Sequence, residues 1–213
     1  MSKKNRISLL VEAFLIAFGL MVFSFFAHHK FPVRFISFAA LLFSAFLISR
    51  HLKTTQDLEN VFGERKRRTI TFLFLGIGIL SGAILAFIYR GNILHSLFPS
   101  EIHAFVLIAA TIGATEELVF RGFLQSMTGK VNGLFSILFS SFSHTAYKCF
   151  LFMSPAVEGD IQMGYLFFWT LGIGLLFGTV RHYSKSITIP LVAHAIFDIL
   201  VYAESSSAPW WVW

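Results

Sequence analysis

Residues 115–121 place three charged side chains within one short segment of an otherwise apolar stretch. Glu117 and Arg121 are four residues apart, so on a helix they lie on one face and can form an ion pair. Glu116 lies about 100° away round such a helix and has no cation of its own there. A desolvated, unpaired carboxylate suits a general base that takes a proton near neutral pH. The structural alternative is an ion pair with Glu116 at the lipid headgroups.

His144 lies well inside the next apolar segment, 131–153. A lone buried histidine is more often a hydrogen-bonded packing residue than a catalytic one, and neighbouring serines and Thr145 offer such bonds here. A catalytic role for His144 therefore needs partners from other segments.

His194 and Asp198 are four residues apart in the last apolar segment, so they also share one helical face. The same spacing places two ligands on a metal in helical zinc motifs. It also lets Asp198 orient a neighbouring histidine or a water. Both interpretations stay open on spacing alone.

The three sets of polar residues come from three different helices, and we expect them to converge near the membrane midplane or in its cytoplasmic half. Two histidines and a carboxylate (His144, His194 and Glu116) can hold and activate one water, with or without a divalent metal such as zinc. No nucleophilic serine is better placed, because a G-x-S-x-G motif is absent. We interpret Cys149, the one cysteine, as a small apolar residue of a helix.

Composition requires that these residues lie in a membrane protein. Hydrophobic residues make up 56% of the chain and charged residues only 13%, against roughly 25% charged in globular proteins. So few charges cannot cover a surface that faces water. The net charge of +6 is gathered in short clusters between apolar runs, which favours contact with membrane lipid and excludes nucleic acid as a partner.

We predict an all-α, polytopic transmembrane bundle of about seven spans, forming a single membrane domain over residues 1–213. A bilayer needs about 20 apolar residues per helix. The candidate spans are 7–27, 31–49, 70–89, 101–122, 131–153, 163–180 and 187–204. Residues 123–130 either extend the fourth helix or form a short interfacial helix. The glycines of GIGILSG in the third span permit close helix packing.

Charge bias predicts a cytoplasmic N-terminus. With seven spans we assign only Lys30 and Arg90 to the outer side. The cytoplasmic segments then hold most of the basic residues: Lys3, Lys4, Arg6, Arg50, Lys53, Arg65, Lys66, Arg67, Arg68, Lys130, Arg181 and Lys185. We read the first span as an uncleaved anchor, because its apolar run is long and lacks a small-residue cleavage site.

In their order and spacing, these motifs resemble the CPBP family, the type II CAAX prenyl endopeptidases and their bacteriocin-processing relatives. The likeness covers residues 102–203, a CPBP-like catalytic core. It rests on E-E-x-x-x-R (Glu116, Glu117, Arg121), on His144, and on H-x-x-x-N/D (His194, Asp198). It implies an all-helical intramembrane protease with a cavity open to the cytoplasm, in the plasma membrane of a prokaryote.

Residue by residue, the resemblance implies that Glu116 activates the water and that His144 is its partner on that water. It places Glu117 and Arg121 as supporting residues, and His194 and Asp198 on the oxyanion side of the site. Such families are described both as metallopeptidases and as metal-independent glutamate peptidases. A metal, if used, is expected at Glu116, His144 and His194.

The sequence departs from the family pattern at two positions. The family's F-x-x-x-H motif has Ser140 here in place of phenylalanine, and Asp198 stands where many members have asparagine. A negative Asp198 opposes oxyanion stabilisation unless it is protonated, paired or metal-bound. We also expect Lys148, one turn after His144, to extend outward towards the headgroups rather than to meet a substrate carboxylate.

The leading hypothesis is therefore an endopeptidase that cleaves a membrane-anchored or C-terminal-tail protein substrate by glutamate-activated attack of water. The main alternative is a non-enzymatic membrane scaffold or bacteriocin-immunity protein on the same fold. A proton- or ion-coupled transporter is a third class, which the absence of an internal repeat disfavours.

Overall fold

The computed structural model describes residues 3–63, 67–155 and 162–206, which are helical throughout with short connections. No β-strand occurs within these ranges, and the all-α prediction is confirmed. The helices are α1 (Lys3–Phe26), α2 (Arg34–Ser49), α3 (Thr55–Phe62), α4 (Arg68–Tyr89), η1 (Arg90–Leu94), α5 (Phe105–Glu117), η2 (Leu118–Leu124), α6 (Gln125–Gly129), α7 (Gly133–Met153), α8 (Met163–Ser184) and α9 (Thr188–Val201).

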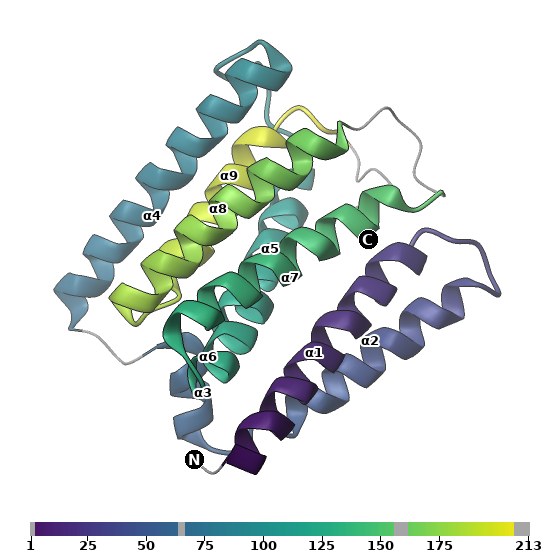
Figure 1. Cartoon of the computed structure of the whole chain (residues 1–213). Helices are drawn as coiled ribbons and strands as arrows, with labels where there is room; N and C mark the ends of the chain where they lie inside the picture. Colours follow the sequence, from purple (N-terminus) through teal and green to yellow (C-terminus); the bar gives the residue numbers. More distant parts are fainter. Residues whose placement is uncertain (1–2, 64–66, 156–161, 207–213) are drawn as a thin grey trace.

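The long helices run up and down in one bundle (Figure 1). The α1–α2 hairpin forms one side, and α1 packs on α7. At the other side α4 packs on α9, and α8 packs on α7. Because α5 packs on α9, the helix with the glutamate pair lies inside the bundle.

The surface of the bundle is apolar and its interior carries charge, as a membrane protein requires. Phe168 and Leu42 leave 73% and 70% of their surface exposed, whereas Glu117 and Arg121 leave 0% and 1%. Three segments of the described chain are long and apolar enough to cross a membrane: Asn5–Phe26, Arg68–Leu94 and Met163–Ser184. The apolar helices Arg34–Ser49 and Thr188–Val201 are shorter, so the predicted number of about seven spans is an approximation.

The segment with the glutamate pair is one continuous helical stretch through α5, η2 and α6. Residues 123–130 therefore extend the predicted fourth helix instead of forming a separate interfacial one. Its middle part, Leu118–Leu124, is π-helical, and π-helical turns inside α-helices are frequent at functional sites. The wider turn begins directly after Glu117 and contains Arg121.

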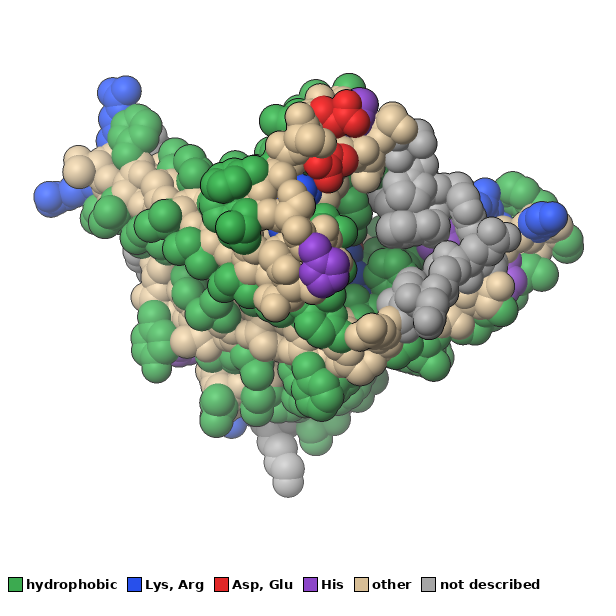
Figure 2. Space-filling model, turned by 90° about the horizontal axis from the view of Figure 1, so that it is seen from above, with side chains coloured by type: hydrophobic (Ala, Val, Ile, Leu, Met, Phe, Trp, Pro, Cys, Tyr) green, Lys and Arg blue, Asp and Glu red, His purple; other side chains and the backbone are tan. Residues whose placement is uncertain are grey.

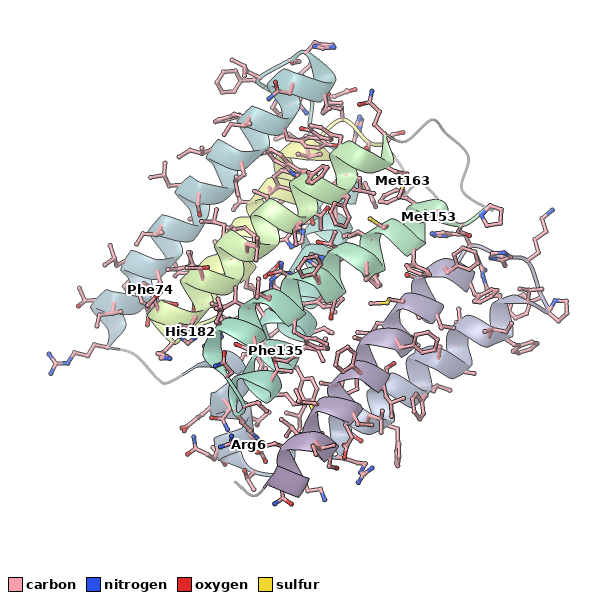
Figure 3. All side chains as sticks on the ribbon, viewed as in Figure 1. Arg6, Phe74, Phe135, Met153, Met163 and His182 are labelled. Atoms are coloured by element: carbon pink, nitrogen blue, oxygen red, sulfur yellow. The ribbon has the colours of Figure 1, made fainter. Side chains whose placement is uncertain are left out.

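The basic residues gather at one end of the bundle, where α1 begins, α2 ends and α8 ends. Figure 3 shows Arg6 and His182 towards this end, and Met153 and Met163 towards the other. We call these the basic end and the far end. Arg65 and Lys66 lie outside the described residues. The assignment of only Lys30 and Arg90 to the outer side was wrong, because Arg34 begins α2 next to Lys30.

A buried arginine ties the far end together. Arg90 is fully buried, donates to the backbone carbonyls of Ser96 and Leu200, and pairs with Glu204 at 3.2 Å. The Ser100 backbone N–H also donates to Glu204, at 2.7 Å. These hydrogen bonds lower the pKa of Glu204 to about 2, and the bonds from Ser100 have the largest effect. The start of the α5 segment and the end of α9 are thereby held to the end of α4.

Glycines of α4 allow close contact with α9, as the GIGILSG segment predicts. A Cβ on Gly82 would lie 2.4 Å from the backbone oxygen of Ala193, and one on Gly78 would lie 2.8 Å from Val192. A Cβ on Gly76 would meet nothing within 4 Å. Two of the glycines therefore set the distance between α4 and α9, and Gly76 does not.

We expect Gly82→Ala to lower the stability of the purified protein by about 1–3 kcal/mol, because the added methyl group meets backbone that cannot give way. Gly76→Ala is the matched control and should be neutral or stabilising, since alanine is favoured over glycine in helices by about 1 kcal/mol. Thermal unfolding in detergent measures both. Equal effects of the two substitutions would contradict this account of the α4–α9 contact.

Candidate active site

The structure brings all six predicted site residues together inside the bundle. Glu116 and Glu117 end α5, Arg121 lies in η2, His144 is on α7, and His194 and Asp198 are on α9. Lys148, one turn after His144 on α7, joins them. Their contacts form a chain that links the three carboxylates of the cluster.

The pair predicted from the i, i+4 spacing is present. Arg121 Nη1 donates to Glu117 Oε1 at 3.1 Å, and neither side chain is exposed by more than 1%. The same Glu117 oxygen lies 2.9 Å from His194 Nδ1. One buried carboxylate thus holds both an arginine from its own helix and a histidine from α9.

Arg121 also determines which nitrogen of His144 carries a proton. Its Nη1 lies 2.5 Å from His144 Nδ1. A guanidinium only donates, so Nδ1 has to be the acceptor. The proton of the neutral ring is then on Nε2, which lies 3.1 Å from Glu116 Oε2 and donates to it. Arg121 therefore orients His144 towards Glu116.

Glu116 has a cation from another helix, which the sequence analysis did not foresee. Lys148 Nζ lies 2.6 Å from Glu116 Oε1. The expectation that Glu116 is unpaired was wrong, because only its own helix was considered. The outward orientation expected for Lys148 was also wrong: the buried carboxylate attracts the ammonium group inward, and 23% of the lysine side chain stays exposed.

His194 faces a gap between two carboxylates. Its Nε2 lies 3.9 Å from Glu116 Oε2 and 3.8 Å from Asp198 Oδ2. Separations above about 3.5 Å between such groups suit a bridging water. Asp198 is 7% exposed and, in this arrangement, is paired with His194.

Close packing fixes the rings and carboxylates in place. The ring of Phe120 stacks on His144 with centroids 4.6 Å apart. Ser140, at the family's phenylalanine position, is buried and donates to a backbone carbonyl of its own helix. A Cβ on Gly113 would lie 2.2 Å from Asp198 Oδ2, and one on Gly174 would lie 2.9 Å from Arg121 Nη2. The two glycines leave room for the charged groups.

A cavity of about 140 Å³ adjoins the cluster. Its walls combine charged residues of the cluster with apolar and aromatic side chains from α4, α7, α8 and α9: Leu85, Tyr89, Glu117, Arg121, His144, Lys148, Phe152, Leu166, Trp169, Thr170, Ile173, Gly174, Phe177, His194, Phe197, Asp198, Val201 and Tyr202. A smaller cavity of about 40 Å³ touches Glu116, Lys148 and Asp198 from the other side. The cluster is thus reachable by a small group through a largely apolar space.

The larger cavity lies towards the far end. Its walls include Leu85 and Tyr89 near the end of α4, Phe152 near the end of α7 and Leu166 near the start of α8. Figure 2 looks onto this end of the bundle. Acidic side chains gather in one place there, and Lys and Arg side chains lie mainly at the periphery of the bundle. The larger cavity is thus nearer the end of the bundle opposite to the N-terminus.

The cluster does not fit a divalent metal in this arrangement. No group of three His, Cys, Asp or Glu side chains in the described ranges is arranged to hold one. A metal-binding histidine normally donates its other ring N–H to an acceptor. His144 instead has the donor Arg121 at Nδ1, and its Nε2 proton is directed at Glu116. Lys148 occupies the other oxygen of Glu116.

Comparison with known proteins relates this part of the chain to a family. A family model described as type II CAAX prenyl endopeptidase Rce1-like matches residues 98–200, a range that contains all seven residues of the cluster. No curated protein and no solved structure matches the chain.

We expect Arg121→Met to destabilise the protein by about 3–5 kcal/mol, because it leaves Glu117 buried without its cation. The double variant Glu117→Met/Arg121→Met removes both charges and should recover part of that loss. Thermal or denaturant unfolding in detergent measures both. If the double variant loses at least as much as the sum of the two single variants, the ion pair is not the unit that stabilises this site.

Proposed function

We propose that this protein is an intramembrane endopeptidase in which Glu116 activates the attacking water, because residues 98–200 match the family model of type II CAAX prenyl endopeptidase Rce1-like proteins. The observation that supports it best is the convergence of Glu116, His144 and His194, since the two histidines line the larger cavity and Glu116 lines the smaller one. The family is one of membrane proteases. The glutamate mechanism, the residue roles and the substrate are proposals for this chain.

The attacking water would lie between Glu116 Oε2, His194 Nε2 and Asp198 Oδ2. The separations of 3.9 and 3.8 Å leave space for it. With His194 Nδ1 donating to Glu117, a second proton on Nε2 would donate to the water. The two carboxylates would accept its hydrogens, and its remaining lone pair would face the peptide carbonyl.

Glu116 acts as the general base. As the water oxygen bonds to the carbonyl carbon, one water proton passes to Glu116 Oε2. When the C–N bond breaks, that proton passes to the leaving nitrogen, which leaves an amine and a new carboxylic acid. The acid then ionises to a carboxylate by giving its proton to the amine. Lys148 and the N–H of His144 keep Glu116 ionised and in position before the reaction.

Lys148 and His194 supply the positive charge near the developing oxyanion. Both lie at the cavity wall, in a space from which bulk water is largely excluded, so their electrostatic effect is strong. Asp198 opposes this effect by its charge, but it also accepts from the water. We assign Asp198 a positioning role.

The substrate is a membrane-associated protein. The apolar walls of the cavity, among them Trp169 and Phe197, suit a segment that arrives from within the bilayer. With the basic end in the cytoplasm, cleavage would take place in the half of the membrane away from the cytoplasm. The plasma membrane of a prokaryote is the proposed location.

A scaffold or immunity protein on the same fold is the competing proposal. The pairing of Glu116 with Lys148 favours it, since a purely structural network also pairs every buried charge. The cavity favours the enzyme, because a structural network has no need of space beside it. An activity measurement separates the two.

We expect Glu116→Gln to reduce cleavage by at least about a hundredfold, because amide oxygen cannot take the water proton. Glu12→Gln is the matched control: Glu12 also pairs with a histidine, His51, at 2.8 Å, but away from the cavity. The full-length proteins are reconstituted in liposomes with a prenylated C-terminal peptide, and membrane-protein fragments are compared in cells that express each variant. A chelator should leave the wild-type rate unchanged.

Cleavage in water labelled with heavy oxygen should place one labelled oxygen in the new carboxylate. Equal cleavage by wild type and Glu116→Gln would contradict the role of Glu116. A folded wild type that cleaves neither the peptide nor any membrane protein would leave the scaffold as the better account. If the chelator abolished activity and added metal restored it, the metal-free mechanism would be contradicted, but the peptidase activity would not.

A further inference from the structure

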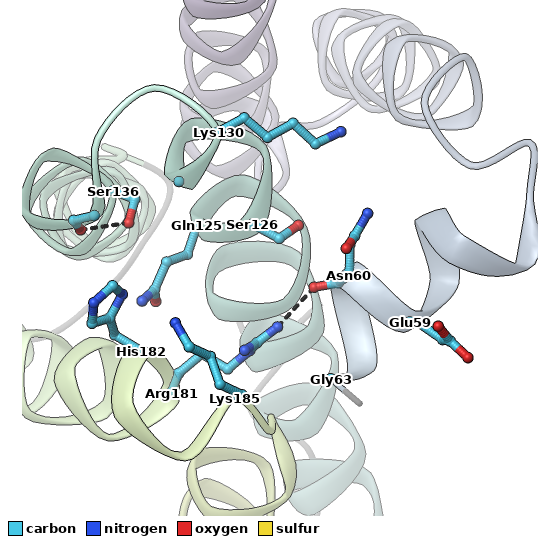
Figure 4. A pocket seen from close by; sticks show the side chains of 12 residues that line it. Glu59, Asn60, Gly63, Gln125, Ser126, Lys130, Ser136, Arg181, His182 and Lys185 are labelled. Atoms are coloured by element: carbon cyan, nitrogen blue, oxygen red, sulfur yellow. Dashed lines mark hydrogen bonds between the residues drawn. The ribbon is translucent and has the colours of Figure 1, made fainter. Parts of the chain in front are cut away.

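A second cavity lies at the basic end, away from the proposed active site. Its volume is about 300 Å³, and it is enclosed by α3, α6, the start of α7 and the end of α8 (Figure 4). The polar side chains that line it include Gln125, Lys130, Arg181, His182 and Lys185. No part of the proposed mechanism uses these residues.

Arg181 is a buried cation without a carboxylate within ion-pair distance in the described part of the chain. It is 8% exposed. Its Nη2 donates to the backbone oxygens of Asn60 and Val61, at 2.7 and 3.3 Å, while its Nε has no hydrogen-bond partner. A buried charge usually has a counterion. Among the described residues no carboxylate fills this role, and an anion in the cavity would do so.

Further polar side chains lie around the same cavity. Figure 4 shows Gln125, His182 and Lys185 turned towards one another beside Arg181, whereas Glu59 points away. Gln125 is 4% exposed; its Nε2 donates to the Gly178 carbonyl at 2.7 Å. Lys130 and Lys185 are exposed at the rim. The charge of the cavity is therefore positive.

The walls of the cavity are fixed by backbone contacts. The Ile187 N–H donates to the Phe62 carbonyl at 3.1 Å, and Gly63 pairs with Ser186. Gly63 has a φ of +96°, and a Cβ there would lie 2.2 Å from the Lys185 carbonyl oxygen. The end of α3 is thereby joined to the turn between α8 and α9, so the donors are held in place before any ligand arrives.

We propose that this cavity binds a phosphate group. Phosphate is favoured because a planar guanidinium and flexible ammonium groups match its several oxygens. The group can come from the headgroup of an anionic phospholipid, since basic cavities between helices on the cytoplasmic side suit such headgroups. It can also come from free phosphate in solution. The chemistry of recognition is the same, and experiment distinguishes the sources.

The test uses the full-length protein and the double variant Lys130→Gln/Lys185→Gln, which keeps the bonds between Arg181 and α3. Lys53→Gln is the control, because Lys53 is exposed at the same end but does not line the cavity. In neutral detergent, the unfolding temperature is followed as inorganic phosphate replaces chloride at constant ionic strength. In phosphatidylglycerol or phosphatidylcholine nanodiscs, native mass spectrometry counts the lipids retained after release.

We expect phosphate binding, phosphatidylglycerol retention, or both, in the wild type and in Lys53→Gln. The double variant should bind roughly thirtyfold more weakly, from the loss of two lysines. A response to phosphate identifies a free anion as sufficient, and a response to phosphatidylglycerol alone identifies the lipid. If the double variant does not fold, Lys130→Gln should show a roughly fivefold loss. Equal binding by wild type and the lysine variants, or an equal loss in Lys53→Gln, would overturn the proposal.

Discussion

The position of Arg121 is the constraint on which the rest of the site depends. A guanidinium that is 1% exposed inside a membrane bundle needs partners on more than one side. It has Glu117 on its own helix and His144 on α7. Through Glu117 it is linked to His194, and through His144 to Glu116 and Lys148. Charges from three helices are thus balanced pair by pair, which makes their burial tolerable and holds each group in a defined orientation.

The packing of the helices follows from the same constraint. Gly174 leaves room for the guanidinium, and Gly113 lets Asp198 approach α5. The π-helical turn that starts after Glu117 changes the direction of the side chains between Glu117 and Gln125, and Arg121 lies within it. The apolar outer surface then only has to face lipid, so phenylalanine and leucine suffice there. Specific packing is concentrated around the charges.

The helices and the Glu117–Arg121 pair could be predicted from sequence because both are local. Runs of apolar residues indicate the helices, and i, i+4 spacing brings the pair together. The partner of Lys148 could not be predicted, since it depends on how α7 is rotated against α5. The same is true of Phe120, which packs on His144 where the family pattern expects the residue at position 140. The end of the bundle towards which the cavity lies also depends on packing between helices. For Lys148, the sequence offered one signal: its i, i+4 spacing from His144 places both side chains on one face of α7, so both can reach Glu116.

The tautomer of His144 tests the central claim most directly, because it depends on Arg121 donating to Nδ1. Solid-state nitrogen NMR of the histidine-labelled protein in lipid, with His144→Gln to assign the signal, reports which ring nitrogen carries the proton. The account predicts a protonated Nε2 and an unprotonated Nδ1, with no change when a chelator is added. A protonated Nδ1, or a His144 signal that shifts when metal is removed, would contradict it.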